Sequence, residues 1–426
     1  MKKILFSLNP LQSVPGNPGL CSLQESVARC TRCNGCVQSC PSYFVYKEET
    51  FSPRGRNQIL RLLLERKIKP SQHIELLERT AAHCMLCGRC TRACAGHLAV
   101  AEHTLALRQA LDLSVLPATL RGVLRWRSRR PDLLAKLADT YYFLKRIGAA
   151  RLARLALPLR WLKHLDDILP DRPVTLPAVL RQAGLKADHD QPGVLYLPGP
   201  ETAYVCGQNG VSALRLLQKK NPRLLWGFSS GLMEQVYGDK IPLLKTARRL
   251  LLEWEKWARG RKLPLVTDSI EIYSFLKNYP VLFASMPGWC ARAEALAAQV
   301  QFITDFMPLR GKAAANPAKT AWDGSGLLSP QDSPLPRVQK ILKTLFGKNL
   351  VECEYSRFPL PAGGTGFARG CPAREMALEN AKDVARGSIE QVFCLSGLAA
   401  LELGAQLRKQ KLQARADSVV CIPIEK

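Results

Sequence analysis

The sequence predicts a multidomain protein in which an all-α domain is followed by a helical linker and two duplicated α/β lobes. Three observations favour this fold class. Two runs of four cysteines lie within the first hundred residues, a basic leucine-rich region with many prolines follows them, and short apolar runs alternate with helical patterns from Gly193 onward. A chain of 426 residues also exceeds what one hydrophobic core usually organises, so two or three domains are expected.

The composition is that of a globular protein, with 47% hydrophobic residues. No apolar run reaches the roughly 18 residues that a membrane-spanning helix needs. The first residues carry two lysines and a short apolar patch, but Asn9-Pro10 interrupts the patch and no small-residue cleavage site follows. We therefore predict no signal peptide and expect a cytoplasmic protein, with peripheral attachment to the inner face of the membrane left open.

The formal net charge is +26, and the lysines and arginines are concentrated between residues 108 and 186. Such a charge favours an acidic partner, an anionic membrane surface or nucleic acid, and the alternative is a solvated basic exterior. No zinc finger, helix-turn-helix or RNA-recognition signature accompanies it, so nucleic acid is not predicted as a partner.

Eight of the fifteen cysteines form two runs with the spacing C-x2-C-x2-C-x3-C. The first run is Cys30, Cys33, Cys36 and Cys40, and the second is Cys84, Cys87, Cys90 and Cys94. This spacing is typical of ferredoxin-type iron–sulfur ligands. A structural zinc site needs only two C-x2-C pairs, and a dense disulfide framework belongs to small secreted domains.

In two-cluster ferredoxins the fourth cysteine of each run binds the other cluster. We therefore predict two [4Fe–4S] clusters with exchanged fourth ligands. Cluster 1 is assigned to Cys30, Cys33, Cys36 and Cys94, and cluster 2 to Cys84, Cys87, Cys90 and Cys40. Five arginines near the runs would stabilise the reduced, more negatively charged state, unless they are plain surface residues; these are Arg32, Arg54, Arg56, Arg89 and Arg92.

Helix signals surround both runs. Ser22 with Glu25 suggests a capped helix before the first run, and Ser52 followed by Pro53 suggests the start of another. Further helices are expected over residues 71–83 and 100–111. We therefore predict a loose tail at 1–20 and an all-helical ferredoxin-type domain at 21–112.

Residues 113–192 are predicted to form a basic helical linker, with leucines at helical spacing and arginines between them. Ordinary amphipathic helices packed on the rest of the protein would explain this pattern. The alternative is a docking surface for a partner or membrane, anchored by Trp126, Trp161 and the pair Tyr141–Tyr142.

The first α/β lobe is predicted at 193–310. Strands are expected within 194–199, 222–231, 263–268 and 280–288, and helices within 211–220 and 245–260. This alternation favours a mostly parallel sheet.

A linker rich in Pro, Gly, Ser and Asp is predicted at 311–336, followed by a second lobe at 337–426. Strands are expected there within 349–355, 391–397 and 419–424, with helices within 338–347 and 374–387. The two lobes share a strand, a small-residue loop, a helix and another strand, which suggests a degenerate duplication.

With both cysteine runs, the intervening SPRGR at 52–56 and this order of domains, the chain resembles the iron–sulfur subunit family of glycolate oxidase and its relatives in lactate utilisation and heterodisulfide reductase. The resemblance is specific in about the first hundred residues. It implies electron transfer from a flavin-dependent 2-hydroxyacid (glycolate or lactate) dehydrogenase subunit to a quinone or another carrier, so the chain is expected to be a non-catalytic subunit of an oxidoreductase complex.

The C-terminal half departs from this family. Its lobes normally carry a Cys-Cys-Gly motif, and the counterparts here are Ser229-Ser230-Gly231 and Pro359-Leu360-Pro361 ahead of Ala362-Gly363-Gly364. Pro200 stands where the family has an early cysteine. We therefore predict no third cluster.

The other cysteines are scattered singly. Cys353, Cys394 and Cys421 are expected in the core, whereas a ligand role is left open for Cys290 and Cys371, which lie in loops. His83 precedes Cys84 and is expected to be a surface histidine at a helix end, with a hydrogen bond to a cluster as the alternative.

The loop 362–366 lacks the spacing and the lysine of a phosphate-binding loop, and no set of catalytic residues is recognised. Two alternatives remain beside the electron-transfer subunit. One is a scaffold subunit of another, heterodisulfide-reductase-like complex, and the other is a basic nucleic-acid-binding metalloprotein.

Overall fold

The computed structural model describes residues 22–111, 130–149, 160–309, 318–324, 333–354 and 372–422, together with positions 8, 122, 123 and 126. Most of the predicted tail at 1–20, the motif at 359–361, the loop at 362–366 and Cys371 lie outside the described residues.

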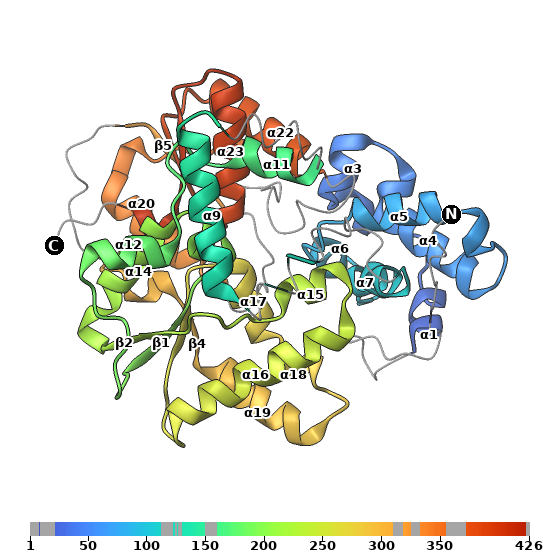
Figure 1. Cartoon of the computed structure of the whole chain (residues 1–426). Coiled ribbons are helices and arrows are strands. Elements are labelled where there is room, and N and C mark those ends of the chain that lie inside the picture. The colour runs from blue at the N-terminus through green and yellow to red at the C-terminus, as the bar shows by residue number, and fades with distance from the viewer. Residues whose placement is uncertain are drawn as a thin grey trace.

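The N-terminal domain is built from helices, drawn from blue to teal in Figure 1. They are α1 (Leu23–Ala28), α2 (Gly35–Gln38), α3 (Pro41–Tyr46), α4 (Pro53–Leu64), α5 (Ile74–Ala82), α6 (Arg89–Arg92) and α7 (Val100–Ala110), with 3-10 turns η2 (Glu49–Phe51) and η3 (Pro70–Gln72). The two predicted caps are confirmed. Ser22 and Glu25 form a capping box at α1, and the Ser52 hydroxyl accepts the Gly55 N–H at 2.9 Å in α4.

The first sheet has four parallel strands in the order β2-β1-β3-β4. These are β1 (Val194–Leu197), β2 (Pro222–Leu224), β3 (Leu265–Thr267) and β4 (Val300–Phe302). The chain first adds β2 on one side of β1 and then β3 on the other. The carboxyl ends of β1 and β3 therefore flank a topological switch point, where open α/β sheets tend to bind ligands.

Helices connect these strands. They are α13 (Pro200–Tyr204), α14 (Gly207–Leu217), α15 (Leu232–Tyr237), α16 (Lys240–Ala258), α17 (Ile270–Lys277), α18 (Tyr279–Leu282) and α19 (Pro287–Gln299), with η4 (Gln218–Lys220) before β2 and η5 (Ile303–Phe306) after β4. The strand expected within 280–288 is wrong, because this apolar run forms α18 and begins α19. Pro280 fits a first helical turn, and the Phe283 ring lies 6.1 Å from that of Tyr279, one helical turn earlier.

The second sheet has three parallel strands in the order β5-β6-β7. Its elements are β5 (Thr320–Asp323), α20 (Leu335–Phe346), η6 (Gly347–Asn349), α22 (Ala373–Arg386), β6 (Gln391–Cys394), α23 (Gly397–Lys409), β7 (Arg415–Ser418) and η7 (Val419–Cys421). Three expectations need correction. β5 lies inside the predicted linker 311–336, so sheet residues begin before 337. Leu350 makes only an isolated bridge to Thr320 where a strand was expected, and the terminal run at 419–424 begins with a 3-10 turn after β7.

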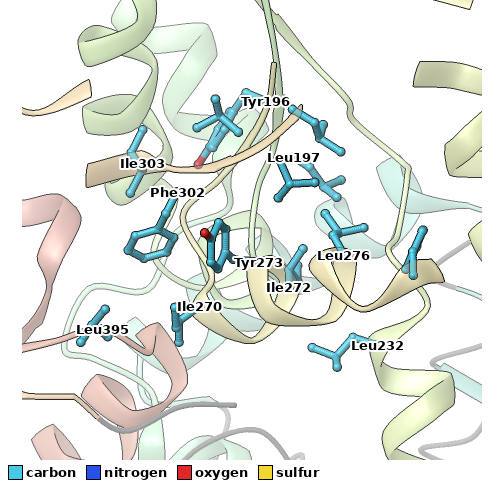
Figure 2. Packing of buried hydrophobic residues seen from close by; sticks show 14 of the residues in the cluster. Tyr196, Leu197, Leu232, Ile270, Ile272, Tyr273, Leu276, Phe302, Ile303 and Leu395 are labelled. Atoms are coloured by element: carbon cyan, nitrogen blue, oxygen red, sulfur yellow. The ribbon is translucent and has the colours of Figure 1, made fainter. Parts of the chain in front are cut away.

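One large hydrophobic core extends through all three parts of the chain. It includes Leu77 and Leu107 of the N-terminal domain, Tyr196 of the first sheet and Leu395 after β6. Figure 2 shows how α17 supplies Ile270, Ile272, Tyr273 and Leu276 to this core, with Leu395 approaching from the second lobe. The described strands differ in number and order between the lobes, so their duplication stays a prediction.

The linker contains α9 (Pro131–Arg146), α11 (Arg160–Ile168) and α12 (Leu176–Ala183). Tyr142 donates to the carbonyl of Tyr204 at 2.7 Å and Tyr141 to Asp166 at 3.1 Å, so these hydroxyls serve contacts within the chain rather than a partner interface. Trp126 is 37% exposed, and the side chain of Trp161 lies outside the described residues. No helix in the described ranges is both long and apolar enough to span a membrane.

Candidate metal centre

The loop of the first cysteine run borders a cavity. Cys30, Cys33 and Cys36 line it, and Cys94 from the end of the second run joins them. The empty space is about 450 Å³, counting the part open to solvent. The structure thus brings the fourth cysteine of one run to the first three of the other.

Both cysteine loops use the same backbone turn. Arg32 and Asn34 have φ angles of +61° and +70°, and Leu86 and Gly88, at the equivalent positions of the second run, have +52° and +70°. A positive φ is uncommon for residues other than glycine. Here it curves the chain between successive cysteines. The short helices α2 and α6 follow the two loops and pack against each other.

Cys40 lies with the second run. Burial raises the pKa of Cys90 well above its usual value, and charges on Cys84, Cys87 and Cys40 raise it further. Arg56 Nη1 is 3.9 Å from Cys40 Sγ and also interacts with Cys84 and Cys90. The four thiols therefore share one electrostatic environment.

Each thiol set needs a cation in order to ionise fully. Burial raises the pKa of Cys36 to about 11, with charge on Cys30 contributing, and burial raises the pKa of Cys87 to about 11. Iron would supply the missing positive charge, because thiolates rather than thiols bind metals. Across the described ranges no three Cys, His, Asp or Glu side chains converge closely enough to hold one metal ion.

Arg56 is a buried cation beside the second set, with 4% of its surface exposed. Its Nε donates to the carbonyl of Thr80 at 3.1 Å, and Nη2 has no hydrogen-bond partner among the described residues. Burial lowers the pKa of Arg56, but the thiolates of Cys84 and Cys40 more than reverse this effect. A guanidinium with a spare donor suits an anionic cluster, and the surface alternative is wrong for Arg56.

A buried histidine, His103, forms a hydrogen-bond network next to the first cysteine set. The His103 Nδ1–H donates to Asn57 Oδ1 at 2.7 Å, because that oxygen only accepts, and Ser26 Oγ then donates to His103 Nε2 at 2.6 Å. Burial lowers the pKa of His103 to about 4, so the ring is neutral at neutral pH. Asn57 also lines the cavity of the first set, so this network fixes α1, α4 and α7 around it.

His83 is buried, and the expected surface position is wrong. Its ring stacks on Phe51 with centroids 3.9 Å apart, and Nδ1 lies 2.7 Å from the carbonyl oxygen of Arg79. Burial lowers its pKa to about 4. The local sequence at a helix end gave no sign of the aromatic residues that cover it.

The single cysteines behave differently from one another. Cys394 is fully buried in β6, as expected, whereas Cys353 and Cys421 are half-buried and lie outside the strands. Cys421 Sγ donates to Asn209 Oδ1 at 3.1 Å. Burial raises the pKa of Cys206 to about 12, and the charges on Glu201 and Cys421 add to this effect. Cys290 Sγ lies 3.6 Å from the Pro280 carbonyl and 3.7 Å from Glu294 Oε1, contacts that do not form a metal site.

Sequence reasoning missed three buried acids at the switch point. Glu201, Asp268 and Glu271 are each at most 3% exposed and follow the carboxyl ends of β1 and β3. Burial raises the pKa of all three carboxyls. The positions of these acids could have indicated them, because each lies within four residues of the end of a predicted strand.

Residues 26–98 match the family model described as a 4Fe-4S dicluster domain. With the two cysteine sets, this match defines an iron–sulfur protein that binds [4Fe–4S] clusters through its N-terminal domain. The chain is also similar to a protein of Bacillus subtilis (strain 168) named "Probable glycolate oxidase iron-sulfur subunit", with 35% identity over 72 residues. That match covers 17% of this chain and only 16% of the relative's length. No solved structure matches the chain.

Proposed function

We propose that the chain is an electron-transfer subunit with two [4Fe–4S] clusters, serving a flavin-dependent 2-hydroxyacid (glycolate or lactate) dehydrogenase. The observation that carries this proposal is the pairing of two cysteine sets in one helical domain, with Cys94 beside the first run and Cys40 beside the second. Each cluster, when bound, can accept and release one electron.

The ligand sets proposed are those predicted from the spacing. Cys30, Cys33, Cys36 and Cys94 hold one cluster, and Cys84, Cys87, Cys90 and Cys40 hold the other. The residues of the chain around them keep water away and balance charge, as Arg56 does beside Cys40. The contact between α2 and α6 keeps the two sets close together, which suits transfer of an electron between them.

The flavoprotein partner is inferred from the name of the B. subtilis relative and from the family resemblance. A partner surface is available on α9 and its C-cap residue, where Leu133, Leu137, Phe143 and Ile147 are 39–58% exposed. Together with the net charge of +26, this surface favours a partner with an acidic, partly apolar face. A cytoplasmic location, at or near the membrane, belongs to the same proposal.

Anaerobic purification tests the cluster content. We expect close to eight iron and eight sulfide per chain, the sum of two [4Fe–4S] clusters, and two interacting signals in electron paramagnetic resonance after reduction. Zinc in place of iron, or iron for a single cluster, would contradict the proposal.

Affinity purification of the tagged chain from its own cells tests the partner. A flavoprotein dehydrogenase should copurify, and Phe143→Ser should reduce its recovery without changing the iron content. Recovery of a heterodisulfide-reductase-like complex instead would favour the scaffold alternative.

A further inference from the structure

A groove of about 840 Å³ runs along the exposed side of α16 in the first lobe. α16 packs against α19 in the lower part of Figure 1. The opposite side of α16 is buried in the core through Ala247, Leu250 and Trp254. Apart from Phe228, the residues that line the groove all belong to α16 between positions 244 and 256. Because one helix forms most of the walls, the groove is open rather than enclosed.

The groove carries an excess of positive charge. Its cations are Lys245, Arg248, Arg249 and Lys256, and its one anion is Glu253. Glu253 already pairs with Lys256, whose Nζ lies 3.3 Å from Glu253 Oε1. The surplus cations therefore favour an anionic occupant.

Two guanidinium groups of the groove are held against aromatic rings. The guanidinium of Arg249 lies 4.7 Å from the ring centroid of Phe228, and that of Arg248 lies 4.9 Å from the ring centroid of Trp289. Arg248 Nη2 also lies 3.0 Å from Met286 Sδ. These contacts restrict both side chains in advance, so less conformational freedom is lost when carboxylates bind them. They also cover one face of each ring, which disfavours stacking of nucleic-acid bases there.

An exposed leucine lies among these cations. Leu252 is 48% exposed, and it follows Lys245 and Arg249 at the spacing i, i+4, i+7, with Lys256 four residues further on. This spacing places the four side chains along one side of α16, over roughly 17 Å of the helix axis. An open groove encloses a small molecule poorly, and a single exposed leucine gives little to insert into a bilayer. A second helix with acidic and apolar residues at the same spacing matches both the charge and the length of the groove.

We propose that this groove docks an acidic amphipathic helix of a partner protein, with carboxylates facing Lys245 and Arg249 and an apolar side chain on Leu252. The inference goes beyond the proposed function, because the interaction requires neither the clusters nor the flavoprotein. It also places the contact on a different helix from the α9 surface.

Fluorescence anisotropy of a labelled peptide tests the groove. The probe is an alanine-based synthetic helix of about 18 residues that carries glutamates and leucines on one face. It is titrated with the full, iron-loaded chain. We expect saturable binding of one peptide per chain, which weakens as the salt concentration rises. A matched peptide with glutamine in place of every glutamate should bind at least about tenfold more weakly.

Charge-reversal variants locate the site. The double variant Lys245→Glu, Arg249→Glu reverses two charges of the groove and should weaken binding of the acidic peptide at least about tenfold. The matched control is Lys340→Glu, Lys343→Glu, which makes the same change of net charge at exposed positions of α20. This control should stay within about threefold of the unaltered chain.

A pair of leucine variants tests the apolar contact. Leu252→Ser should weaken binding about threefold or more, because an apolar side chain in the groove is lost. Leu137→Ser, at a leucine of α9 that is 49% exposed, should bind as the unaltered chain does. Iron content and a thermal melt establish that each variant is folded.

The groove site is overturned if the acidic peptide shows no saturable binding, if the glutamine peptide binds as well, or if the α16 double variant binds unchanged. A lower dissociation constant for phosphatidylglycerol vesicles or for duplex DNA than for the peptide, with binding lost in the same double variant, also overturns it. The groove would then belong to a lipid surface or a nucleic acid. None of these results alters the proposed function, which depends on the iron content and on recovery of the flavoprotein.

Discussion

The guanidinium of Arg108 in α7 donates a 2.6 Å hydrogen bond to the carbonyl oxygen of Val236 in α15. The same side chain, which is fully buried, also donates to the carbonyls of Ala81 and Cys84. One residue of the N-terminal domain therefore joins the start of the second cysteine run to the first lobe.

Replacing this arginine should destabilise the whole chain. Arg108→Met leaves three buried carbonyl oxygens without their donor, so we expect a loss of about 3 kcal/mol or more in the free energy of unfolding. Urea denaturation measures the effect. Arg61→Met, which removes an i,i+4 surface pair with Glu65, is the control and should change stability by about 0.5 kcal/mol or less. Equal losses in the two variants would show that the buried contacts contribute little.

The proposed exchange of fourth ligands predicts a different result from a model in which each run binds its own cluster. Cys94→Ser should abolish the same paramagnetic signal as Cys33→Ser, and Cys40→Ser the same signal as Cys87→Ser. Cys290→Ala should keep both signals, because its thiol has no other cysteine beside it among the contacts described. If Cys94→Ser and Cys87→Ser affect one common signal, each run binds its own cluster and the exchange is wrong.

The charge of Arg56 should set the potential of the cluster beside Cys40. Arg56→Met removes a buried cation that favours the reduced, more negative state, so the midpoint potential should fall by on the order of 60 mV, which corresponds to about 1.4 kcal/mol for one electron. Arg56→Lys keeps the charge and should restore most of the shift. Redox titration followed by paramagnetic resonance measures both values, and an unchanged potential in Arg56→Met would refute this role.

Stability should fall in mild acid because of His103. The pKa of His103 is about 4 in the folded chain and near 6.5 in the unfolded chain. Between these two pH values the unfolded state is largely protonated at this residue and the folded state is not. The contribution of His103 to the free energy of unfolding is fully present above about pH 6.5. It decreases by about 3 kcal/mol as the pH falls towards about 4. His103→Asn should flatten this part of the curve in urea denaturation from pH 7 to pH 4.5. A curve parallel to that of the unaltered chain would locate the effect elsewhere, for example at His83.

Local signals in the sequence were sufficient for much of the N-terminal domain. The serines at positions 22 and 52 cap helices because capping depends on residues only three apart, and the cysteine spacing indicates a loop that curves around a metal centre. β1, β3 and β6 also lie within predicted strands, where β-branched and aromatic residues are bounded by Pro, Gly or Ser.

Long-range burial could not be predicted in the same way. Nothing near Arg56 or Arg108 distinguishes them from the many exposed arginines, because their partners lie 16 to 128 residues away. The apolar run at 280–288 was assigned as a strand since periodicity does not separate a short buried helix from a buried strand. β4 follows α19 without a break, and β5 lies inside a segment rich in Pro, Gly, Ser and Asp, so neither strand is marked off in the sequence.

The proposed exchange of fourth ligands has a consequence for biosynthesis. Each proposed ligand set contains cysteines from both runs: Cys40 joins Cys84, Cys87 and Cys90, and Cys94 joins Cys30, Cys33 and Cys36. Neither set is therefore complete until the ribosome has released both runs. Iron delivered earlier would meet three thiols of the first set and Cys40 alone of the second. With exchanged ligands, complete cluster insertion would therefore follow the synthesis of both runs and of α4 and α5 between them.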